Sequence, residues 1–445
     1  MIFLGIDVGS TTIKGCALNV DRGVVENVCA RPFPEPIEGL CKGRFEVDPE
    51  AAVEAARELL VELSKTVDRY EGVFFCSQMG GLVLTDANNR PLTNYLSWRD
   101  QRSLEPYKQG GVSFLETLKS RIDPVDFARI GAELAAGSEL SLLFWLSATD
   151  SLPKNGAYAL NLGDYVVARL CHTTPKTEYT LALGAVDLLT RDRPYALYRR
   201  LGLDRVGRPE LVDYAEPAGS ITLRGRSTPC FPAVGDHQTA LWGAGAIEGE
   251  LSINISTGSQ VAMIEPKPKL GRYQTRCYFG GGYLNTITHL PAGRSLTALI
   301  DLLCELAIAD GSAIRDPWSI VDRAAAGVRE TEVDVSLAFF AGPTGDRGHI
   351  KNLRLENLTV GDLFRAAFKN MVDHYERFAS RLSPDRKWSG IVLSGSASRR
   401  LPTLTRMIEE RFRLPTRVAA ATEETLTGLL KLATEYRHQQ DGVIL

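Results

Sequence analysis

The first residues that could do chemistry lie in a short turn near the N-terminus. Asp7 ends an alternating apolar stretch, and the hydroxyl-bearing residues Ser10, Thr11 and Thr12 follow it, with Lys14 just beyond. Such a turn offers backbone N–H groups and hydroxyls that suit phosphate oxygens. A single carboxylate can hold Mg²⁺ through the water molecules that this ion retains. A plain tight hairpin with a surface carboxylate and lysine explains these residues equally well.

A second turn repeats this pattern in the other half of the chain. Strand-like residues lead into Ser256-Thr257-Gly258-Ser259, and another apolar stretch leads out. The position that matches Asp7 is Ser256, so only one copy carries a carboxylate. The pair predicts a two-sided clamp for one nucleotide–Mg²⁺ complex, in which Thr257 and Gly258 contact phosphate.

A third segment, Gly235-Asp236-His237-Gln238, lies close to the expected boundary between the two halves. A carboxylate in a cleft between domains could act as a general base on an alcohol. Asp236 could also cap a helix that opens at Gln238, and the two roles are compatible.

Two further segments could bind a polyol. The first contains Gln78 and Met79, and the second contains Trp98, Arg99 and Asp100. Sugar sites combine an aromatic wall with side chains that form several hydrogen bonds. The alternative is a half-buried packing tryptophan and a solvated charged turn, and composition alone favours this alternative.

The expected secondary structure is an α/β arrangement with an internal repeat. Apolar alternation predicts hairpins at 2–18 and 251–264, a repetition that favours a duplicated fold with a cleft between its halves. Short buried strands are expected at 72–76, 82–85 and 391–393, and helices at 49–64, 125–146, 165–170, 402–412 and 423–437. The stretch 209–232 is weakly patterned. We therefore expect an N-terminal domain at 1–245, a C-terminal domain at 246–435 and a frayed polar tail at 436–445.

Composition narrows the classes of function. The 445 residues carry 51 Lys and Arg against 54 Asp and Glu, and this balance gives no support for binding nucleic acid or an acidic membrane. No apolar run is long enough to span a bilayer, and the N-terminus is interpreted as a strand rather than a signal peptide. The eight cysteines form no CxxC pair, which indicates buried thiols in a reducing cytoplasm. P-loop, GxGxxG, HExxH and GxSxG motifs are all absent.

Taken in order, these segments resemble the FGGY family of carbohydrate kinases, within the actin-like ATPase superfamily, over nearly the whole chain. Residues 3–18 are similar to the first phosphate motif of that family. Residues 77–81 resemble its S-G-Q-M-H-G segment, and 96–102 its W-x-D-x-R turn. Gly235-Asp236-His237-Gln238 resembles G-D-x-Q, which carries the family's catalytic base. Residues 394–398 resemble the Gly-rich adenosine motif.

Within the family, residues 253–260 and 278–284 are most similar to sedoheptulokinases. Two departures from the family pattern concern ligands. Gly80 replaces a histidine, which would enlarge the sugar pocket. Ser394 stands where glycine is usual, which could alter affinity for the base.

The resemblance implies two actin-like, ribonuclease H-like α/β domains with the site in the cleft between them. It implies ATP and Mg²⁺ as cofactors, Asp7 at the metal and Asp236 as the general base. The turns at Ser10–Thr12 and Thr257–Gly258 and the charge of Lys14 would serve phosphate, and Gly395, Ser396 and Ala397 would border the adenosine. The sugar would contact Gln78, Met79, Trp98, Arg99, Asp100 and His237.

The expected reaction is phosphorylation of sedoheptulose to sedoheptulose 7-phosphate. A kinase for a pentulose such as xylulose or ribulose, or for another polyol, is the alternative. A catalytically silent nucleotide-gated binding protein is the rival from another class. The expected partner is a small sugar, with no nucleic acid or membrane, and a homodimer is left open.

Overall fold

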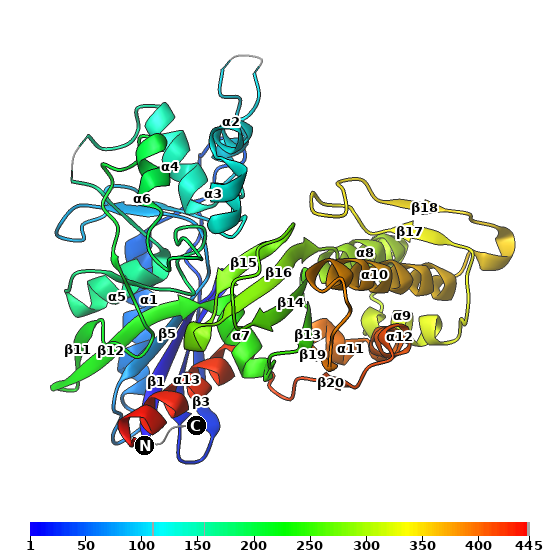
Figure 1. Ribbon diagram of the computed structural model, residues 1–445. Coiled ribbons are helices and arrows are strands. Elements are labelled where there is room, and N and C mark those ends of the chain that lie inside the picture. Colours follow the sequence, from blue (N-terminus) through cyan, green and yellow to red (C-terminus); the bar gives the residue numbers. More distant parts are fainter. Residues whose placement is uncertain (109–110, 155, 443–445) are drawn as a thin grey trace.

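The computed structural model describes residues 1–108, 111–154 and 156–442. Its framework is two six-stranded sheets, one in each half of the chain, with helices on their faces (Figure 1). The strands of the first sheet run in the order β11-β12-β5-β1-β2-β3, and those of the second in the order β15-β16-β14-β13-β19-β20. The expectation of two α/β halves is therefore confirmed.

The two sheets share a central pattern, as the repeated hairpins predict. In the first, β1 (Ile2–Val8) pairs antiparallel with β2 (Thr12–Asn19) and parallel with β5 (Val73–Ser77). In the second, β13 (Glu250–Ile255) pairs antiparallel with β14 (Ser259–Glu265) and parallel with β19 (Gly390–Ser394). In each half the turn of the hairpin therefore follows the strand that also makes the parallel pairing.

The side chains of β1 alternate between two buried faces of the first sheet. Leu4, Ile6 and Val8 pack with helices α1 (Pro49–Leu63) and α5 (Leu162–Cys171) in one core cluster. Phe3 belongs to a cluster on the opposite face, with helices α7 (Asp236–Ala244) and α13 (Glu424–Gln440). Because side chains alternate along a strand, Asp7 shares the face of Phe3 and points toward α13.

Short elements complete the N-terminal half, and several of them form a group of helices above the first sheet with a core of its own (Figure 1). The strands are β3 (Val24–Pro32), β4 (Glu46–Val47), β6 (Val83–Thr85), β7 (Tyr95–Leu96), β8 (Tyr158–Leu160), β9 (Lys176–Glu178), β10 (Glu210–Val212), β11 (Gly219–Leu223) and β12 (Arg226–Gly235). The helices are α2 (Phe114–Arg121), α3 (Pro124–Arg129), α4 (Glu139–Ala148) and α6 (Tyr195–Arg200).

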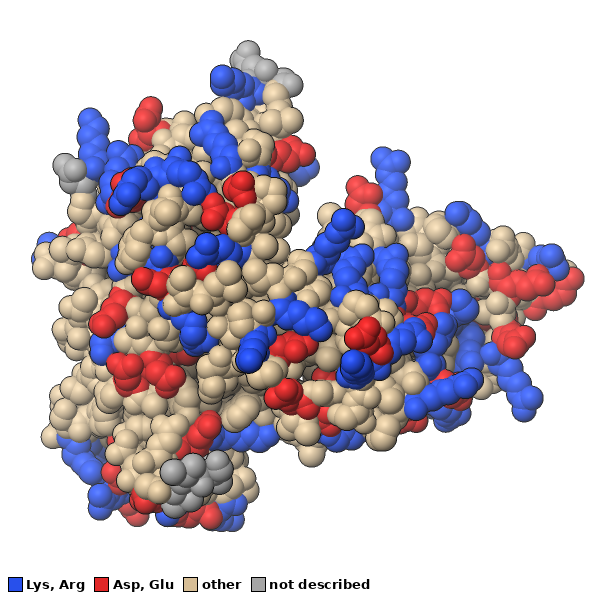
Figure 2. Space-filling model, viewed as in Figure 1, with Lys and Arg blue, Asp and Glu red and all other residues tan. Residues whose placement is uncertain are grey.

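In the C-terminal half, the long helix α10 and its neighbours cover one face of the second sheet. The strands are β15 (Gln274–Cys277), β16 (Tyr283–Leu290), β17 (Asp334–Ser336), β18 (His349–Lys351) and β20 (Thr416–Val418). The helices are α8 (Gly293–Ala309), α9 (Pro317–Ala326), α10 (Val360–Leu382), α11 (Ser396–Arg400) and α12 (Pro402–Phe412). In the space-filling view, a notch separates the upper part of the N-terminal half from the C-terminal half (Figure 2).

Helices α7 and α13 join the two halves, because their core cluster also takes in Ala262, Leu284 and Val392 of the second sheet. Two glycines allow the helices to cross closely. A Cβ at Gly243 would lie 1.9 Å from the carbonyl oxygen of Glu424, and one at Gly428 would lie 2.0 Å from that of Thr239. Since neither approach is compatible with a side chain, this crossing requires glycine at both positions.

Three sequence expectations need correction. The stretch 125–146 is not one helix, because Gly131 and Ala132 adopt positive φ angles of 75° and 53° and interrupt it. The weakly patterned stretch 209–232 contains strands of the first sheet, where apolar residues face helices on both sides. The tail is not frayed up to Gln440: α13 continues to that residue, and residues 443–445 lie outside the described part.

The aromatic side chain of Tyr436 explains why the end of α13 is ordered. Its ring lies 4.7 Å from that of Phe231 and 6.0 Å from those of Phe3 and Phe74, measured between centroids. The last helix of the chain is therefore anchored on the sheet of the first half. Across the described residues, no helix combines the length and apolar character needed to cross a membrane.

Candidate active site

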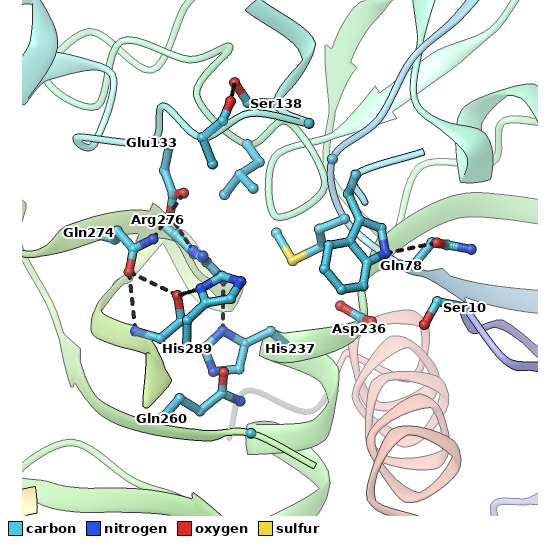
Figure 3. A pocket seen from close by; sticks show the side chains of 18 of the residues that line it. Ser10, Gln78, Glu133, Ser138, Asp236, His237, Gln260, Gln274, Arg276 and His289 are labelled. Carbon is cyan, nitrogen blue, oxygen red and sulfur yellow. Dashed lines mark hydrogen bonds and ion pairs between the residues drawn. The ribbon is translucent and has the colours of Figure 1, made fainter. Parts of the chain in front are cut away.

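A cavity of about 360 Å³ lies between the two halves of the molecule (Figure 3). Its N-terminal wall comes from the segment after β5, the Trp98 turn, the break between α3 and α4, and the start of α7. Its C-terminal wall comes from β13–β16 and the turn after β13. The volume is within the range of small-molecule sites, and both halves are needed to form it.

Asp7 is a buried carboxylate with one oxygen uncommitted. Its Oδ2 accepts a hydrogen bond of 2.7 Å from the Thr425 hydroxyl of α13, whereas Oδ1 is buried without a partner. Burial raises the pKa of Asp7, and Lys14 and the Thr425 hydrogen bond act against that rise. An unpartnered buried carboxylate oxygen is a feature that a cation or its bound water would satisfy. The residues present therefore fit the expected Mg²⁺.

Asp236 is the first residue of α7, directly after strand β12. Burial and the charge of Asp7 raise its pKa from 3.8 to about 7. The structure corrects the expected helix cap, because Gly235 occupies the N-cap position and the helix begins at Asp236. A carboxylate with a pKa near neutrality is suited to accepting and releasing a proton at physiological pH.

A buried hydrogen-bond network holds the turn that carries Asp236. The Gly235 N–H donates to the Thr180 hydroxyl at 2.9 Å, and the Gln238 side chain donates to the Thr180 carbonyl at 3.1 Å. The Thr180 N–H in turn donates to the Glu178 carboxyl at 2.6 Å. Burial raises the pKa of Glu178 to about 8. This network fixes the backbone on both sides of Asp236.

The predicted sugar-side residues Gln78, Met79 and Trp98 line the cavity. The Trp98 indole N–H donates to Gln78 Oε1 at 3.1 Å (Figure 3), and Gln78 Nε2 donates to the Gly9 carbonyl at 3.3 Å. These contacts connect the aromatic wall to the first phosphate turn. Gly80 also lines the cavity, but its φ of +80° already favours glycine. The absence of a side chain at this position therefore does not indicate that the site accepts a larger sugar.

Arg99 and Asp100 are not among the residues that line the cavity. Asp100 is fully buried, and its oxygens accept hydrogen bonds from the Arg102 guanidinium and the Phe45 N–H. Direct contact of Asp100 with a sugar is therefore not supported; its geometry indicates that it fixes the Trp98 turn. Arg99 donates to the carbonyl and hydroxyl of Ser10 at 3.2 and 3.1 Å, which places its charge at the first phosphate turn.

The first turn faces the same end of the cleft as Asp7. Ser10 lines the cavity beside Asp236, Thr11 completes the turn between β1 and β2, and Thr12 begins β2. Lys14 forms an ion pair with Glu423 at 2.5 Å, which joins β2 to the start of α13. Its charge is thus already partly neutralised by a neighbouring carboxylate.

The second turn, Thr257 and Gly258, is exposed and joined to α8, because the Arg294 N–H donates to the Thr257 carbonyl at 2.8 Å. Gly395 lies beside it with a φ of +84°, and a Cβ there would be 2.4 Å from the Ile255 carbonyl oxygen. Ser396 and Ala397 begin α11 immediately after it. The second turn and the segment expected around the adenosine therefore lie together. Ser394 is buried and accepts a hydrogen bond from Asn254, so that departure from the family pattern has an internal explanation.

The inner end of the cavity contains polar residues that sequence reasoning missed. Arg276 of β15 donates to Glu133 at 2.5 Å and to Nδ1 of His237 at 2.8 Å (Figure 3). Gln274 and His289 lie beside them. Glu133 lies in the break between α3 and α4, which the helical pattern concealed. Arg276 stands two residues before Tyr278, just outside the segment 278–284 that resembles the family.

Known proteins resemble this chain in sequence and in fold. Residues 2–228 match the model of the N-terminal domain of the FGGY family of carbohydrate kinases. The chain is 24% identical to a xylulose kinase of Lactococcus lactis over 309 residues. This alignment covers 66% of this chain and 60% of the relative. A gluconokinase of Bacillus subtilis is 22% identical over 60% of the chain and 52% of its own length. The matches thus span only about half to three fifths of these relatives.

The solved structures show the fold over a larger part of the chain. The ligand-bound xylulose kinase of Lactobacillus acidophilus superposes with a TM-score of 0.85 at 17% identity, covering 98% of this chain and 90% of that one. The fold is thus the two-domain α/β fold with actin-like ATPase architecture. The expected similarity to sedoheptulokinases has no counterpart among these relatives. With the family model matching just over half of the chain, this protein belongs to the FGGY family of carbohydrate kinases.

Proposed function

We propose that this protein transfers the terminal phosphoryl group of ATP to a hydroxyl group of an open-chain ketose. The observation that carries the proposal is a pair of carboxylates: Asp7, which is buried, and Asp236, which lines a cavity formed by both halves of the molecule. Their charges act on one another, since Asp7 raises the pKa of Asp236. Phosphoryl transfer depends mainly on positioning and on neutralising charge, which such a cleft can provide.

ATP bound with Mg²⁺ would supply the phosphoryl group. Asp7 would hold the cation through its uncommitted oxygen. The turns at Ser10–Thr12 and Thr257–Gly258 would contact phosphate, with Arg99 close to the first turn. Gly395, Ser396 and Ala397 would border the adenosine.

Asp236 would accept the proton of the attacking hydroxyl, and its raised pKa keeps it basic enough to do so near pH 7. Gln78, Met79, Trp98 and His237 would orient the sugar, since all four line the cavity. Closure of the two halves would exclude water from the reacting groups and limit wasteful hydrolysis.

The first acceptor to test is D-xylulose, because xylulose kinases occur both among the sequence relatives and among the structures with this fold. Sedoheptulose is the second candidate, supported by the sequence of residues 253–260. The glycine at position 80 adds nothing to it, since backbone conformation accounts for that residue. Location in a reducing cytoplasm and assembly into a homodimer remain predictions.

The proposal is tested by measuring ADP release with a panel of D-xylulose, D-ribulose, L-ribulose, sedoheptulose and glycerol, in the presence of ATP and Mg²⁺. We expect sugar-dependent ADP release with at least one ketose, and loss of most of it in Asp236→Asn. Nucleotide binding without turnover on any sugar would favour the rival, a silent binding protein.

A further inference from the structure

The inner end of the cavity holds a charge-balanced group of three side chains: Glu133, Arg276 and His237. All are more than nine-tenths buried. Glu133 and His237 belong to the N-terminal half, whereas Arg276 reaches them from β15 of the second sheet. Nε of Arg276 lies 2.5 Å from Glu133 Oε1, and its Nη1 lies 2.8 Å from His237 Nδ1.

The contact with Arg276 determines which nitrogen of His237 carries the proton. A guanidinium group can only donate hydrogen bonds, so Nδ1 of His237 must accept. The ring proton is then on Nε2, which is buried without a partner in the protein. Burial and the neighbouring Arg276 lower the pKa of His237 well below 6.5, so the ring stays neutral. His237, which lines the cavity, thus carries on Nε2 an N–H donor that has no partner in the protein.

The charges of the lining indicate the kind of acceptor. Among the described residues that line the cavity, the formally charged ones are Glu133, Asp236 and Arg276. The single cation is already paired with Glu133. Burial also lowers the pKa of His289, which favours its neutral form. An anionic substrate would therefore meet no uncompensated positive charge and would lie close to two carboxylates.

We propose that Glu133, Arg276 and His237 together select an uncharged sugar: Arg276 holds His237 as an N–H donor to a substrate oxygen, and Glu133 cancels the charge that would otherwise attract a carboxylate. This rests on the proposed kinase function and narrows its substrate class. The selection of an uncharged sugar would distinguish this protein from its gluconokinase relative, whose name indicates an aldonate acceptor. Arg276 and Glu133 are positioning residues here, since they act through His237 and through the net charge.

The test compares kcat and KM for the best ketose of the panel with those for D-gluconate. In the wild type we expect kcat/KM to favour the ketose by about a hundredfold, the order expected when like charges are brought together in a buried site. Glu133→Gln keeps the shape but leaves the charge of Arg276 uncompensated. This variant should shift the ratio of the two kcat/KM values toward gluconate by about tenfold or more. The shift should come from the KM values for the sugars, while the KM for ATP stays unchanged.

Glu139→Gln provides a matched control. Glu139 and Arg208 form another buried pair, with side chains 8% and 3% exposed and an N–O distance of 3.2 Å, and neither lines the cavity. This variant removes a buried charge of the same kind and should leave the ratio of the two sugars as in the wild type. A similar shift in both variants would show a general effect of destabilisation and would overturn the proposal.

Calorimetric binding of the ketoses and of D-gluconate to the wild-type protein gives a readout that needs neither turnover nor a folded variant. Tighter binding of gluconate, or an unchanged sugar ratio in a stably folded Glu133→Gln, would overturn the inference. Binding of a ketose without phosphorylation would instead refute the kinase function and leave the selection of uncharged sugars standing. Phosphorylation of gluconate in preference to every ketose would refute the inference alone and leave phosphoryl transfer standing.

Discussion

Replacing Asp236 with asparagine is predicted to raise the stability of the protein at pH 8 while it lowers kcat. In the folded protein, loss of solvation and the charge of Asp7 raise the pKa of this carboxyl group from 3.8 to about 7. Between these two values the folded state binds the proton more tightly than the unfolded state. The contribution of this group to stability therefore falls as pH rises from about 4 to about 7, and it stays at its lowest above pH 7.

The size of the effect follows from the shift. A change of about three pK units corresponds to about 4 kcal/mol of destabilisation above pH 7, at 1.36 kcal/mol per unit. Asparagine has nearly the same shape and no charge to desolvate. It gives up the favourable interaction of a carboxylate with the first turn of α7, which is typically worth about 0.3–1 kcal/mol. We therefore expect Asp236→Asn to be more stable than the wild type at pH 8, and the advantage to shrink at pH 5.

The assay combines thermal unfolding at pH 5 and pH 8, in EDTA and without nucleotide, with steady-state kinetics. At pH 8 the variant should melt several degrees higher than the wild type, and its kcat should fall about 10²- to 10⁴-fold, the usual value of general-base assistance. Wild-type kcat/KM should also decline below about pH 7. Equal melting temperatures at pH 8 together with near-normal kcat would refute both the destabilising effect of the Asp236 carboxylate and its assignment as the general base.

Three other substitutions test separate parts of the site. Asp7→Asn should raise the Mg²⁺ concentration for half-maximal activity at least about tenfold, because Oδ1 is the uncommitted ligand; an unchanged Mg²⁺ titration would contradict its role. Gly395→Ala should cost about 1–3 kcal/mol in denaturant unfolding and raise the KM for ATP, since its Cβ would lie 2.4 Å from the Ile255 carbonyl oxygen. Glu178→Gln should retain kcat within about threefold, because the pKa of about 8 keeps the native carboxyl group mostly protonated at pH 7. Glu178→Ala should lower kcat about tenfold, because it removes the hydrogen bond with Thr180. Equal losses of kcat in the two variants would show that activity does not depend on this hydrogen bond.

The sequence was sufficient to predict features that depend on local pattern. Alternating apolar residues identified both hairpins, and the helix expected at 49–64 begins at Pro49 as predicted, with Asp48 as its cap. The same pattern led to Asp7, because the residue before a hydroxyl-rich turn is easily recognised. Asp236 followed from its motif, and the structure places it at the cavity as expected.

Features that depend on long-range contacts could not be predicted in this way. The pKa of Asp236 depends on burial and on Asp7, which lies far away in the chain. Glu133 and Arg276 meet across the cleft from segments 143 residues apart, and neither belongs to a pattern that indicates an ion pair. Asp100 looked like a sugar ligand only because its partners, Arg102 and the Phe45 N–H, are not evident from sequence spacing.

The most direct test of the central claim is to follow one reaction mixture of the protein, ATP, Mg²⁺ and D-xylulose by ³¹P NMR. Sedoheptulose replaces D-xylulose in a parallel sample, and the Asp236→Asn variant serves as the matched control. We predict a new phosphomonoester resonance that grows in step with ADP in the wild type and is nearly absent from the control. Release of inorganic phosphate alone, or no loss of ATP with either sugar, would contradict the assignment of this cleft as the active site of a ketose kinase.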